Sequence, residues 1–403
     1  GRRPPARRSR ARIPADQLGG FPWPRNLAEW GGTLKGNALA EDENNIGDDL
    51  REPDTNLRKG WTTGACATAA AVSAYGALLT GHFTDPVVIR LPRGQTPSFV
   101  LHDSKLDGDT AMAAIEKDAG DDPDVTHGAI VRAQLRRLDN TAEIIFKAGP
   151  GVGTVTRPGL PLGVGEPAIN PGPRAMITDN IRELGGDGLE ITISIDNGEA
   201  LAARTWNPRL GIIGGLSVLG TTGIVVPYSC SAWIASIRQA VDVARAGGIT
   251  HVAAATGSTS EDAVAKLLGL PATALIDMGD FAGGLLKYVR DNPIPKVTIA
   301  GGFGKLSKLA DGHLDLHSKR SQVNPGFLAS LAADAGADGE LRKAIEAADS
   351  AGRILEIVLD AGFPLVDAVA ARAREVALDQ LQGSGEAEVL IFDRAGALAG
   401  RAP

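Results

Sequence analysis

The second half of the chain alternates short apolar segments with segments of helical character, and glycine-containing turns separate them. The segments 251–257, 272–279 and 296–302 are predicted to be strands. The segments 258–269 and 281–291 between them are predicted to be helices. Strand–helix alternation of this kind predicts a Rossmann-like, largely parallel sheet flanked by helices.

Neighbouring segments extend this pattern. Residues 229–248 carry apolar side chains at a spacing of roughly 3.6 residues, which predicts a helix before the first strand. Ser258 and Glu261 have the spacing of a capping box at the start of the next helix. Two or three helices between about 327 and 382 are expected to lead to a last strand at 388–393.

The first half is richer in strands. An Ala-rich segment at 65–79 predicts a helix, with Thr62 or Thr63 as its N-cap and Gly81 as its stop. Several β-rich segments accompany it, at 86–92, 97–103, 129–138, 142–149 and 188–198. This half is therefore predicted to be α+β.

The length of 403 residues favours two domains over one core. Residues 1–53 mix an Arg/Pro head with an acidic stretch, which predicts a disordered or loosely docked extension. The remaining chain is divided into an α+β domain at 54–205 and an α/β domain with a helical C-terminal segment at 206–403. The predicted fold class is thus a two-domain mixed α/β protein.

The formal net charge of -7 disfavours a nucleic-acid partner. The two cysteines, Cys66 and Cys230, cannot build a disulfide framework or a four-thiolate zinc site, so a reducing cytoplasm is expected. No apolar run is expected to approach the roughly 18 residues that cross a bilayer, so no membrane association is predicted.

Three turns of the second half follow predicted strands and enter predicted helices: 255–261, 277–284 and 300–307. Turns at the carboxyl ends of parallel strands can offer bare backbone N–H groups to a ligand, but glycine and serine also occur in any tight turn. The nucleotide signatures fail, because there is no G-x-G-x-x-G, and only two residues separate Gly301 from Gly304 where a P-loop needs four.

The segment 117–128, "KDAGDDPDVTHG", contains four aspartates and one histidine. It could be a metal loop, a clamp for a cationic ligand or a solvated turn, and it fails the EF-hand pattern. His313 and His317 are four residues apart and could share a helix face, but no H-E-x-x-H accompanies them. No protein-held metal is therefore predicted.

The segment 207–229 mixes five glycines with a continuous apolar background. It is too apolar for an ordinary loop and too rich in glycine for an ordinary helix. Its backbone is expected to lie close to another element or to a ligand.

Six blocks between about residue 57 and residue 320 resemble the cobalt-precorrin-5B C1-methyltransferase family, the CbiD proteins. The blocks are "WTTGACATAAA", "KDAGDDPDVTHGA", "GPGVGTVTRPGL", "GEPAINPGPR", "NPRLGIIGGLSVLGTTGIVVPYS" and "GGFGKLSKLADGHLDLHS". The resemblance implies a transferase of corrin (cobalamin) biosynthesis that passes a methyl group from S-adenosylmethionine to C1 of cobalt-precorrin-5B, giving cobalt-precorrin-6A. Cobalt would enter only as part of the tetrapyrrole substrate.

The implied chemistry suggests two sets of residues. Carboxylates and bare backbone suit the cationic cosubstrate, and the candidates are Asp118, Asp121, Asp122, Gly214, Gly215, Gly220, Thr221, Thr222, Thr256, Gly257 and Ser258. Asp124 belongs to the same loop, and these aspartates either face the cosubstrate or hold the loop that does. Cations suit the carboxylates of the tetrapyrrole, and the candidates are Lys305, Lys308, His317 and Arg320, with Lys319 beside them. Thr62 and Thr63 are further candidates for the substrate site.

A catalytic base is not assigned, and the candidates for it are Asp118, Asp122 and His317. Two other functions stay open at this point: a non-catalytic corrinoid carrier, and a nucleotide-dependent enzyme that binds phosphate at 300–307. Neighbouring enzymes of the pathway and a second copy of the chain are the candidate protein partners.

Overall fold

The computed structural model describes residues 56–139 and 141–403, and the prediction for residues 1–53 lies outside them. One five-stranded sheet has the order β4-β5-β6-β10-β7. Its strands are β4 (Asp103–Asp107), β5 (Thr110–Glu116), β6 (Ile130–Arg137), β7 (Ile144–Ala148) and β10 (Leu189–Ile195). β10 pairs antiparallel with β6 and parallel with β7, so the sheet is mixed.

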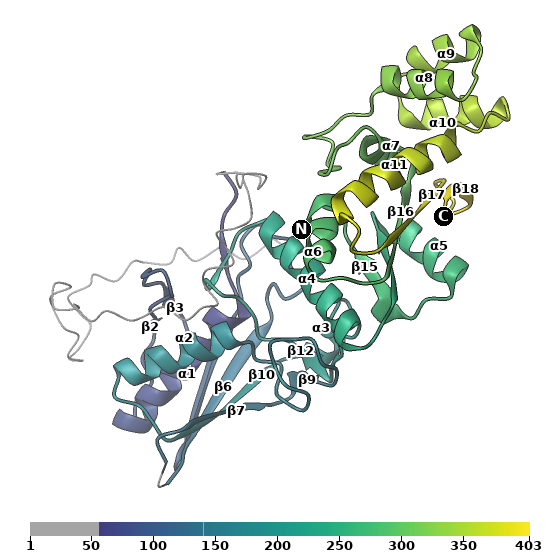
Figure 1. The fold of residues 1–403 in the computed structure, drawn as a ribbon. Helices are drawn as coiled ribbons and strands as arrows, with labels where there is room; N and C mark the ends of the chain where they lie inside the picture. Colours follow the sequence, from purple (N-terminus) through teal and green to yellow (C-terminus); the bar gives the residue numbers. More distant parts are fainter. Residues whose placement is uncertain (1–55, 140) are drawn as a thin grey trace, which may run out of the picture. The chain divides into compact units, whose positions relative to one another are not determined.

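Two helices, α1 (Thr63–Thr80) and α2 (Pro171–Glu183), lie side by side against this sheet (Figure 1). The small side chains of α1 let it approach the strands closely, and most of its residues are buried. Thr62 is its N-cap, with Oγ1 accepting from Ala65 N at 3.1 Å, and Gly81 ends it with a φ of 80°. The predicted helix and both of its end signals are confirmed.

α1 also corrects the expectation about apolar runs. Its 18 residues have the length and mean hydropathy of a membrane span, but 83% of that window is buried inside the protein. A buried window of this kind is what the core helix of a folded domain shows.

Short two-stranded ladders tie the first half of the chain to the glycine-rich segment 207–229. β1 (Gly60–Trp61) pairs with β13 (Ile224–Val225), and β8 (Gly151–Val152) pairs with β12 (Gly215–Leu216). A third ladder joins β9 (Thr154–Val155) to β11 (Ile212–Ile213). The strands predicted at 86–92 and 97–103 are reduced to β2 (Val87–Val88) and β3 (Ser98–Phe99).

The second five-stranded sheet has the order β15-β14-β16-β17-β18. Its strands are β14 (His251–Ala255), β15 (Leu275–Asp277), β16 (Lys296–Gly302), β17 (Glu386–Phe392) and β18 (Leu398–Ala402). The first four are parallel and β18 is an antiparallel edge, which confirms the largely parallel sheet. Mixed α/β is therefore the correct fold class.

Helices cover both faces of this sheet. One face packs on α4 (Cys230–Ala246), α6 (Ala282–Asp291), α7 (Phe303–Ala310) and α11 (Leu365–Leu381), while α5 (Ser258–Leu268) lies on the other. Adjacent residues of β14 confirm this alternation, because Ala254 belongs to the first core and Ala253 to the second.

The C-terminal segment differs from its prediction in two ways. Four helices precede the strand rather than two or three: α8 (Pro325–Asp334), α9 (Gly339–Glu346), α10 (Ala351–Asp360) and α11. β17 is also not the last strand, because β18 returns beside it. Polar turns break the apolar pattern here, so the number of helices was hard to count from sequence.

One local prediction was wrong, and one short helix was not predicted. The capping box is wrong: Gly257 is the N-cap of α5, without a side-chain cap bond, and the Glu261 carboxylate binds Arg209 instead. The short helix α3 (Gly198–Ala202) begins directly after Asn197, beyond the end of β10. All described residues lie in one compact unit, so the boundary between 205 and 206 stays a prediction.

Candidate functional site

The C-terminal sheet has a topological switch point between β14 and β16. From β14 the chain passes through α5 to β15 on one side, and then through α6 to β16 on the other side of β14. Open α/β sheets bind ligands beyond the carboxyl ends of the strands at such a point. The turn 256–258 follows β14 there, and Gly301 and Gly302 end β16. We call this region the sheet-edge crevice.

Two glycines of the sheet-edge crevice present bare backbone. A side-chain carbon added at Gly257 or Gly302 would meet no atom within 4 Å. At Gly301 the same carbon would lie 2.8 Å from the hydroxyl of Thr256, so that glycine serves packing. A ligand can therefore approach Gly257 and Gly302 closely, at the N-terminal ends of α5 and α7.

Lys305, in the first turn of α7, lies across the sheet-edge crevice. Its Nζ donates a hydrogen bond to Thr256 O at 2.7 Å and forms an ion pair with Asp280 Oδ1 at 3.0 Å. Asp280 lies in the turn between β15 and α6, so Lys305 links the ends of neighbouring strands. The ammonium that we expected to bind substrate carboxylates is thus paired with oxygens of the protein itself.

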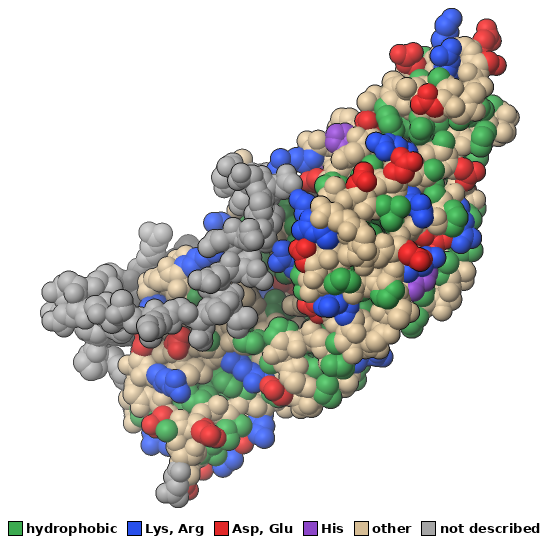
Figure 2. All heavy atoms as spheres, in the orientation of Figure 1, with side chains coloured by type: hydrophobic (Ala, Val, Ile, Leu, Met, Phe, Trp, Pro, Cys, Tyr) green, Lys and Arg blue, Asp and Glu red, His purple; other side chains and the backbone are tan. Residues whose placement is uncertain are grey.

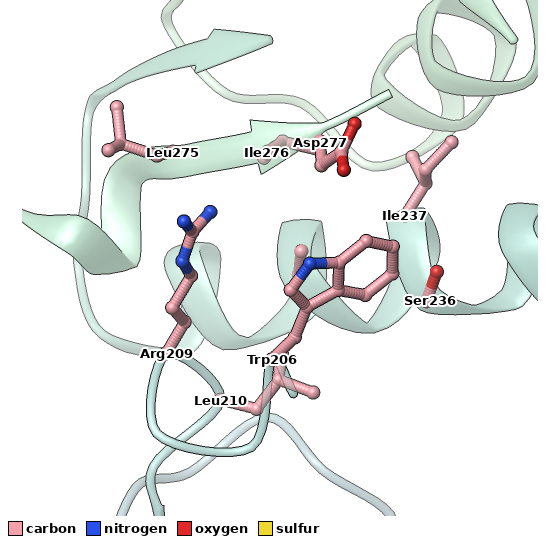
Figure 3. Close-up of a pocket in the computed structure, with 9 residues that line it drawn as sticks. Trp206, Arg209, Leu210, Ser236, Ile237, Leu275, Ile276 and Asp277 are labelled. Atoms are coloured by element: carbon pink, nitrogen blue, oxygen red, sulfur yellow. The ribbon is translucent and has the colours of Figure 1, made fainter. Parts of the chain in front are cut away.

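Asp277 ends β15 and pairs with Ala255, the residue before the 256–258 turn. Figure 3 shows a small pocket that Asp277 lines together with Trp206 and Arg209 of the loop before β11. Burial, and then the negative charge of Glu261, raises the pKa of Asp277 above its ordinary value. The carboxyl edge of the sheet therefore carries a partly buried carboxylate beside the glycine turn.

Arg209 connects the glycine-rich segment to the first turn of α5. It forms a bidentate pair with the buried side chain of Glu261, with Nη1 to Oε2 at 2.9 Å. Aromatic packing reinforces this link: Trp206 lies edge-on to Trp233 of α4, with ring centroids 5.6 Å apart. The Trp233 indole N–H then donates to Asp277 O at 3.2 Å.

The aspartates of 117–128 bind groups of the protein itself. Asp118 forms a bidentate ion pair with Arg58, and Asp121 accepts from the Arg58 backbone N–H at 2.6 Å. The hydrogen bonds from the Arg58 side chain, against a smaller opposing effect of burial, hold the pKa of Asp118 below its usual value. These two carboxylates fasten the start of the described chain to the loop.

The other two aspartates act in the same way. Asp122 Oδ1 accepts a hydrogen bond from Tyr228 N at 2.8 Å. Asp124 pairs with the buried Lys117 at 2.6 Å and accepts bonds from Thr126. These contacts favour holding the loop, one of the two roles expected from sequence, over direct contact with the cosubstrate.

The glycine-rich segment packs mainly against backbone. A side-chain carbon at Gly215 would lie 2.3 Å from the carbonyl of Gly151, and one at Gly220 would lie 2.4 Å from the side chain of Thr62. Thr63 Oγ1 accepts from Leu219 N at 3.0 Å. Close approach to another element, rather than to a ligand, accounts for these glycines, and Thr62 and Thr63 are buried in the contact.

Three other residues of this segment were predicted to bind the cosubstrate. Gly214 and Thr221 are exposed, and a carbon added at Gly214 would meet no atom within 4 Å. Thr222 Oγ1 accepts from Ile224 N at 3.3 Å and stabilises the entry to β13. The predicted cosubstrate residues thus lie in two places, at the sheet-edge crevice and beside the N-cap of α1.

The predicted substrate residues at the end of α7 and after it differ in accessibility. Lys308 is buried, its Nζ donates to Leu316 O at 2.8 Å, and burial lowers its pKa. His317 Nδ1 accepts from Lys319 N at 3.1 Å, whereas Arg320 is exposed. Figure 2 shows Lys and Arg interspersed with Asp and Glu over the visible face, rather than one field of a single sign.

The residues that the structure describes contain no group of three or more His, Cys, Asp or Glu side chains arranged to hold a metal ion. His313 and His317 do not share a helix, because α7 ends at Ala310 and Gly312 takes a left-handed φ of 92°. Sequence reasoning also missed Arg209, Glu261 and Asp277, although Asp277 ends a correctly predicted strand.

The switch point, the bare glycine turns and the nearby carboxylate define an α/β protein with a candidate ligand site at the edge of its parallel sheet. The CbiD family model matches residues 50–227, and the model of the CbiD C-terminal domain matches residues 315–403. The chain belongs to the CbiD family.

Relatives match nearly their full length. The cobalt-precorrin-5B C(1)-methyltransferase of Rhodospirillum rubrum is 56% identical over 87% of this chain and 99% of its own. The enzyme of the same name from Paramagnetospirillum magneticum is 55% identical over 86% of this chain and 98% of its own. The crystal structure of a cobalamin biosynthesis protein (CbiD) from Archaeoglobus fulgidus aligns with 67% of this chain and 86% of its own, at 27% identity and a TM-score of 0.37.

Proposed function

We infer that this chain transfers a methyl group to C1 of cobalt-precorrin-5B in cobalamin biosynthesis, with S-adenosylmethionine as the methyl donor. The observation that carries this inference is the 56% identity to a relative named for that reaction, over 99% of the relative's length. Loss of the methyl group turns a sulfonium into a neutral thioether, so the protein must align the donor and manage its charge without needing a covalent nucleophile.

We propose that the cosubstrate binds in the sheet-edge crevice. The open space at Gly257 and Gly302 fits a ligand that contacts bare backbone, and the N-terminal ends of α5 and α7 suit its carboxylate. Asp277 brings negative charge to the same edge, which suits the sulfonium group, whereas the charge of Asp280 is paired with Lys305. The aspartates of 117–128 then act by holding the loop rather than by binding the donor.

The tetrapyrrole carries several carboxylates, and exposed cations next to the sheet-edge crevice suit them. Lys319 and Arg320 are exposed, and their side chains make no hydrogen bond or ion pair with the described residues. They follow Leu316, whose N–H donates to Asp280 O at 2.8 Å, so they extend from the edge at which we place the donor. Lys308 is left out of this set because its ammonium is buried on Leu316 O.

One of the three candidate bases keeps a ring nitrogen available. Asp118 and Asp122 hold the loop, whereas Nε2 of His317 has no hydrogen-bond partner among the described residues. We therefore propose His317 for any proton transfer that accompanies methylation. It directly follows Leu316, which is bonded to the turn that contains Asp280.

The test of the activity is incubation of the chain with cobalt-precorrin-5B and S-adenosylmethionine carrying a labelled methyl group. We expect the tetrapyrrole to gain one methyl group, which mass spectrometry counts and NMR assigns to C1. A tetrapyrrole that binds but gains no methyl group would support the corrinoid-carrier alternative instead.

The test of the site is a pair of glycine variants measured by calorimetry with S-adenosylhomocysteine, with and without tetrapyrrole. Gly257→Ala places a methyl group in the open space of the crevice and should weaken binding about tenfold or more, or about 1.4 kcal/mol. Gly326→Ala, near the start of α8, is the matched control and should bind like the wild type. Equal affinities of both variants would exclude the sheet-edge crevice as the donor site.

A further inference from the structure

The first strand–helix–strand unit of the parallel sheet is β14–α5–β15, and it ends at Asp277. The donor site proposed above uses Asp277 only for its charge. Gly257 lies in the turn after β14, and Asp277 ends β15, twenty residues further along the chain. A glycine turn after one strand, followed about 20 residues later by an acid at the end of the next, is the arrangement in which carboxylates bind ribose hydroxyls. The chain has this spacing without the G-x-G-x-x-G motif.

The ladder register brings the two features together. Asp277 pairs with Ala255, and Met278 N donates to Ala255 O at 3.0 Å, so the carboxylate stands beside the first residues of the turn. Neighbouring strands lie about 4.8 Å apart. One ribose can therefore contact both Gly257, after β14, and Asp277, at the end of β15.

The Asp277 carboxylate has acceptor capacity to spare. Its Oδ1 accepts from Gly279 N at 3.2 Å, and Oδ2 accepts no hydrogen bond from the residues that the structure describes. The two other acids of the edge are occupied, because Glu261 binds Arg209 and Asp280 pairs with Lys305. Of these three acids, Asp277 alone forms no ion pair with the described residues, and its Oδ2 can accept from a ligand.

A small pocket of about 20 Å³ lies beside Asp277, too small to enclose a base but open to one that packs over its wall. Most of its lining is apolar, with Trp206, Leu210, Ile237 and Ile276 among the residues that form it (Figure 3). A nucleoside presents a flat, largely apolar base next to its diol, so an apolar wall next to a carboxylate matches that order of groups.

We propose that Asp277 binds the ribose diol of the methyl donor, accepting hydrogen bonds from its 2′- and 3′-hydroxyls. This proposal rests on the proposed function, because that function supplies the nucleoside ligand. Replacing Asp277 by a neutral residue removes a charged acceptor of hydrogen bonds. The resulting loss of affinity must therefore depend on the presence of the ribose hydroxyls in the ligand.

The test is calorimetry on the full chain with S-adenosylhomocysteine and with its 2′,3′-dideoxy analogue. Asp277→Asn should bind S-adenosylhomocysteine at least about tenfold more weakly than the wild type, while both proteins bind the dideoxy analogue equally. Asp334→Asn, at the exposed end of α8, should match the wild type with both ligands. Asp277→Ser serves as a second variant if the asparagine variant unfolds.

The outcomes separate this proposal from the one it rests on. If Asp277→Asn loses affinity for both ligands equally, or for neither, the diol assignment is overturned. Methyl transfer from the same donor still stands in that case. No binding of S-adenosylmethionine or S-adenosylhomocysteine to the wild type, with and without tetrapyrrole, overturns both.

Discussion

The carboxylate of Asp122 accepts a hydrogen bond from the backbone N–H of Tyr228 at 2.8 Å. Tyr228 adopts a left-handed φ of 56° although its side chain is 65% exposed. A left-handed conformation costs a residue other than glycine roughly 1–2 kcal/mol, so another interaction must hold it. Ser229, the next residue, is the N-cap of α4, and Asp122 thereby fixes how the chain enters that helix.

We expect Asp122→Ala to lower the free energy of unfolding by about 1 kcal/mol, because the Tyr228 N–H loses a charged acceptor. Adding Tyr228→Gly should restore most of that loss, since glycine adopts a left-handed φ without a steric penalty. Urea unfolding measures both effects. An Asp122→Ala protein with unchanged stability and an unchanged Tyr228 amide chemical shift would contradict the role assigned to this bond.

Lys117 is predicted to be needed for folding of the aspartate loop. Its side chain is 1% exposed and pairs with Asp124. Burial opposes ionisation of Asp124, but Lys117 and Thr126 outweigh it and hold the pKa of Asp124 below its usual value. Lys117→Met leaves that carboxylate without its cation and should cost about 3–5 kcal/mol in the free energy of unfolding.

The double variant Lys117→Met, Asp124→Leu provides the control, because replacing both members of a buried pair by apolar residues is often neutral. It should be more stable than Lys117→Met alone. If thermal unfolding finds the two variants equally destabilised, the pair has no coupling and the prediction is wrong.

Glu388 predicts a pH dependence of stability. It is fully buried in β17 and bonded to Lys296, Thr298 and Arg401. Burial acts to raise its pKa, but these three partners outweigh it and lower the pKa of Glu388 below its ordinary value. Its stabilising contribution is therefore complete above the unfolded pKa of about 4.3 and is lost as the pH falls through the lower, folded pKa.

We expect Glu388→Gln to be less stable than the wild type by about 3 kcal/mol at pH 7, with the difference shrinking as the pH falls below about 4.3. Urea unfolding between pH 3 and pH 7 measures it. Glu356→Gln removes an exposed carboxylate that pairs with Arg353, and should change little at any pH. A difference that stays constant over the whole range would refute the assignment.

Gly220 is predicted to serve packing rather than ligand binding. Its φ is 116°, and a methyl group there would meet the side chain of Thr62 at 2.4 Å. Gly248 also has a positive φ, 71°, but faces open space. Gly220→Ala should therefore destabilise the protein by about 1–2 kcal/mol more than Gly248→Ala in thermal unfolding. Equal losses would mean that the Thr62 contact adjusts without cost.

Local signals were sufficient for several elements. Thr62, Gly81 and the small residues between them specify both ends of α1, because capping and helix propensity act within a few residues of sequence. The order of strands and helices in the parallel sheet followed from the same kind of signal. The capping box failed because Arg209, 52 residues away in sequence, competes for the Glu261 carboxylate.

Site chemistry was predicted less well than the elements. The charge of Asp118 and Asp122 indicated carboxylates that could meet a cationic ligand, but Arg58 and the Tyr228 N–H already bind them. The only signal that Asp277 carried was its place at the end of a strand, twenty residues after Gly257. Its importance depends on the ladder with β14, which sets it next to the turn that contains Gly257.

The sequence by itself determined which segments become helices and strands, the mixed α/β class and, through six long blocks, membership of one family. Only the tertiary structure decided which charges are paired inside the protein and which carboxylate of the sheet edge stays without an ion pair among the described residues. The physical reason is that hydrogen bonds and ion pairs form between groups that folding brings together, whatever their separation along the chain, whereas propensity and capping act between near neighbours.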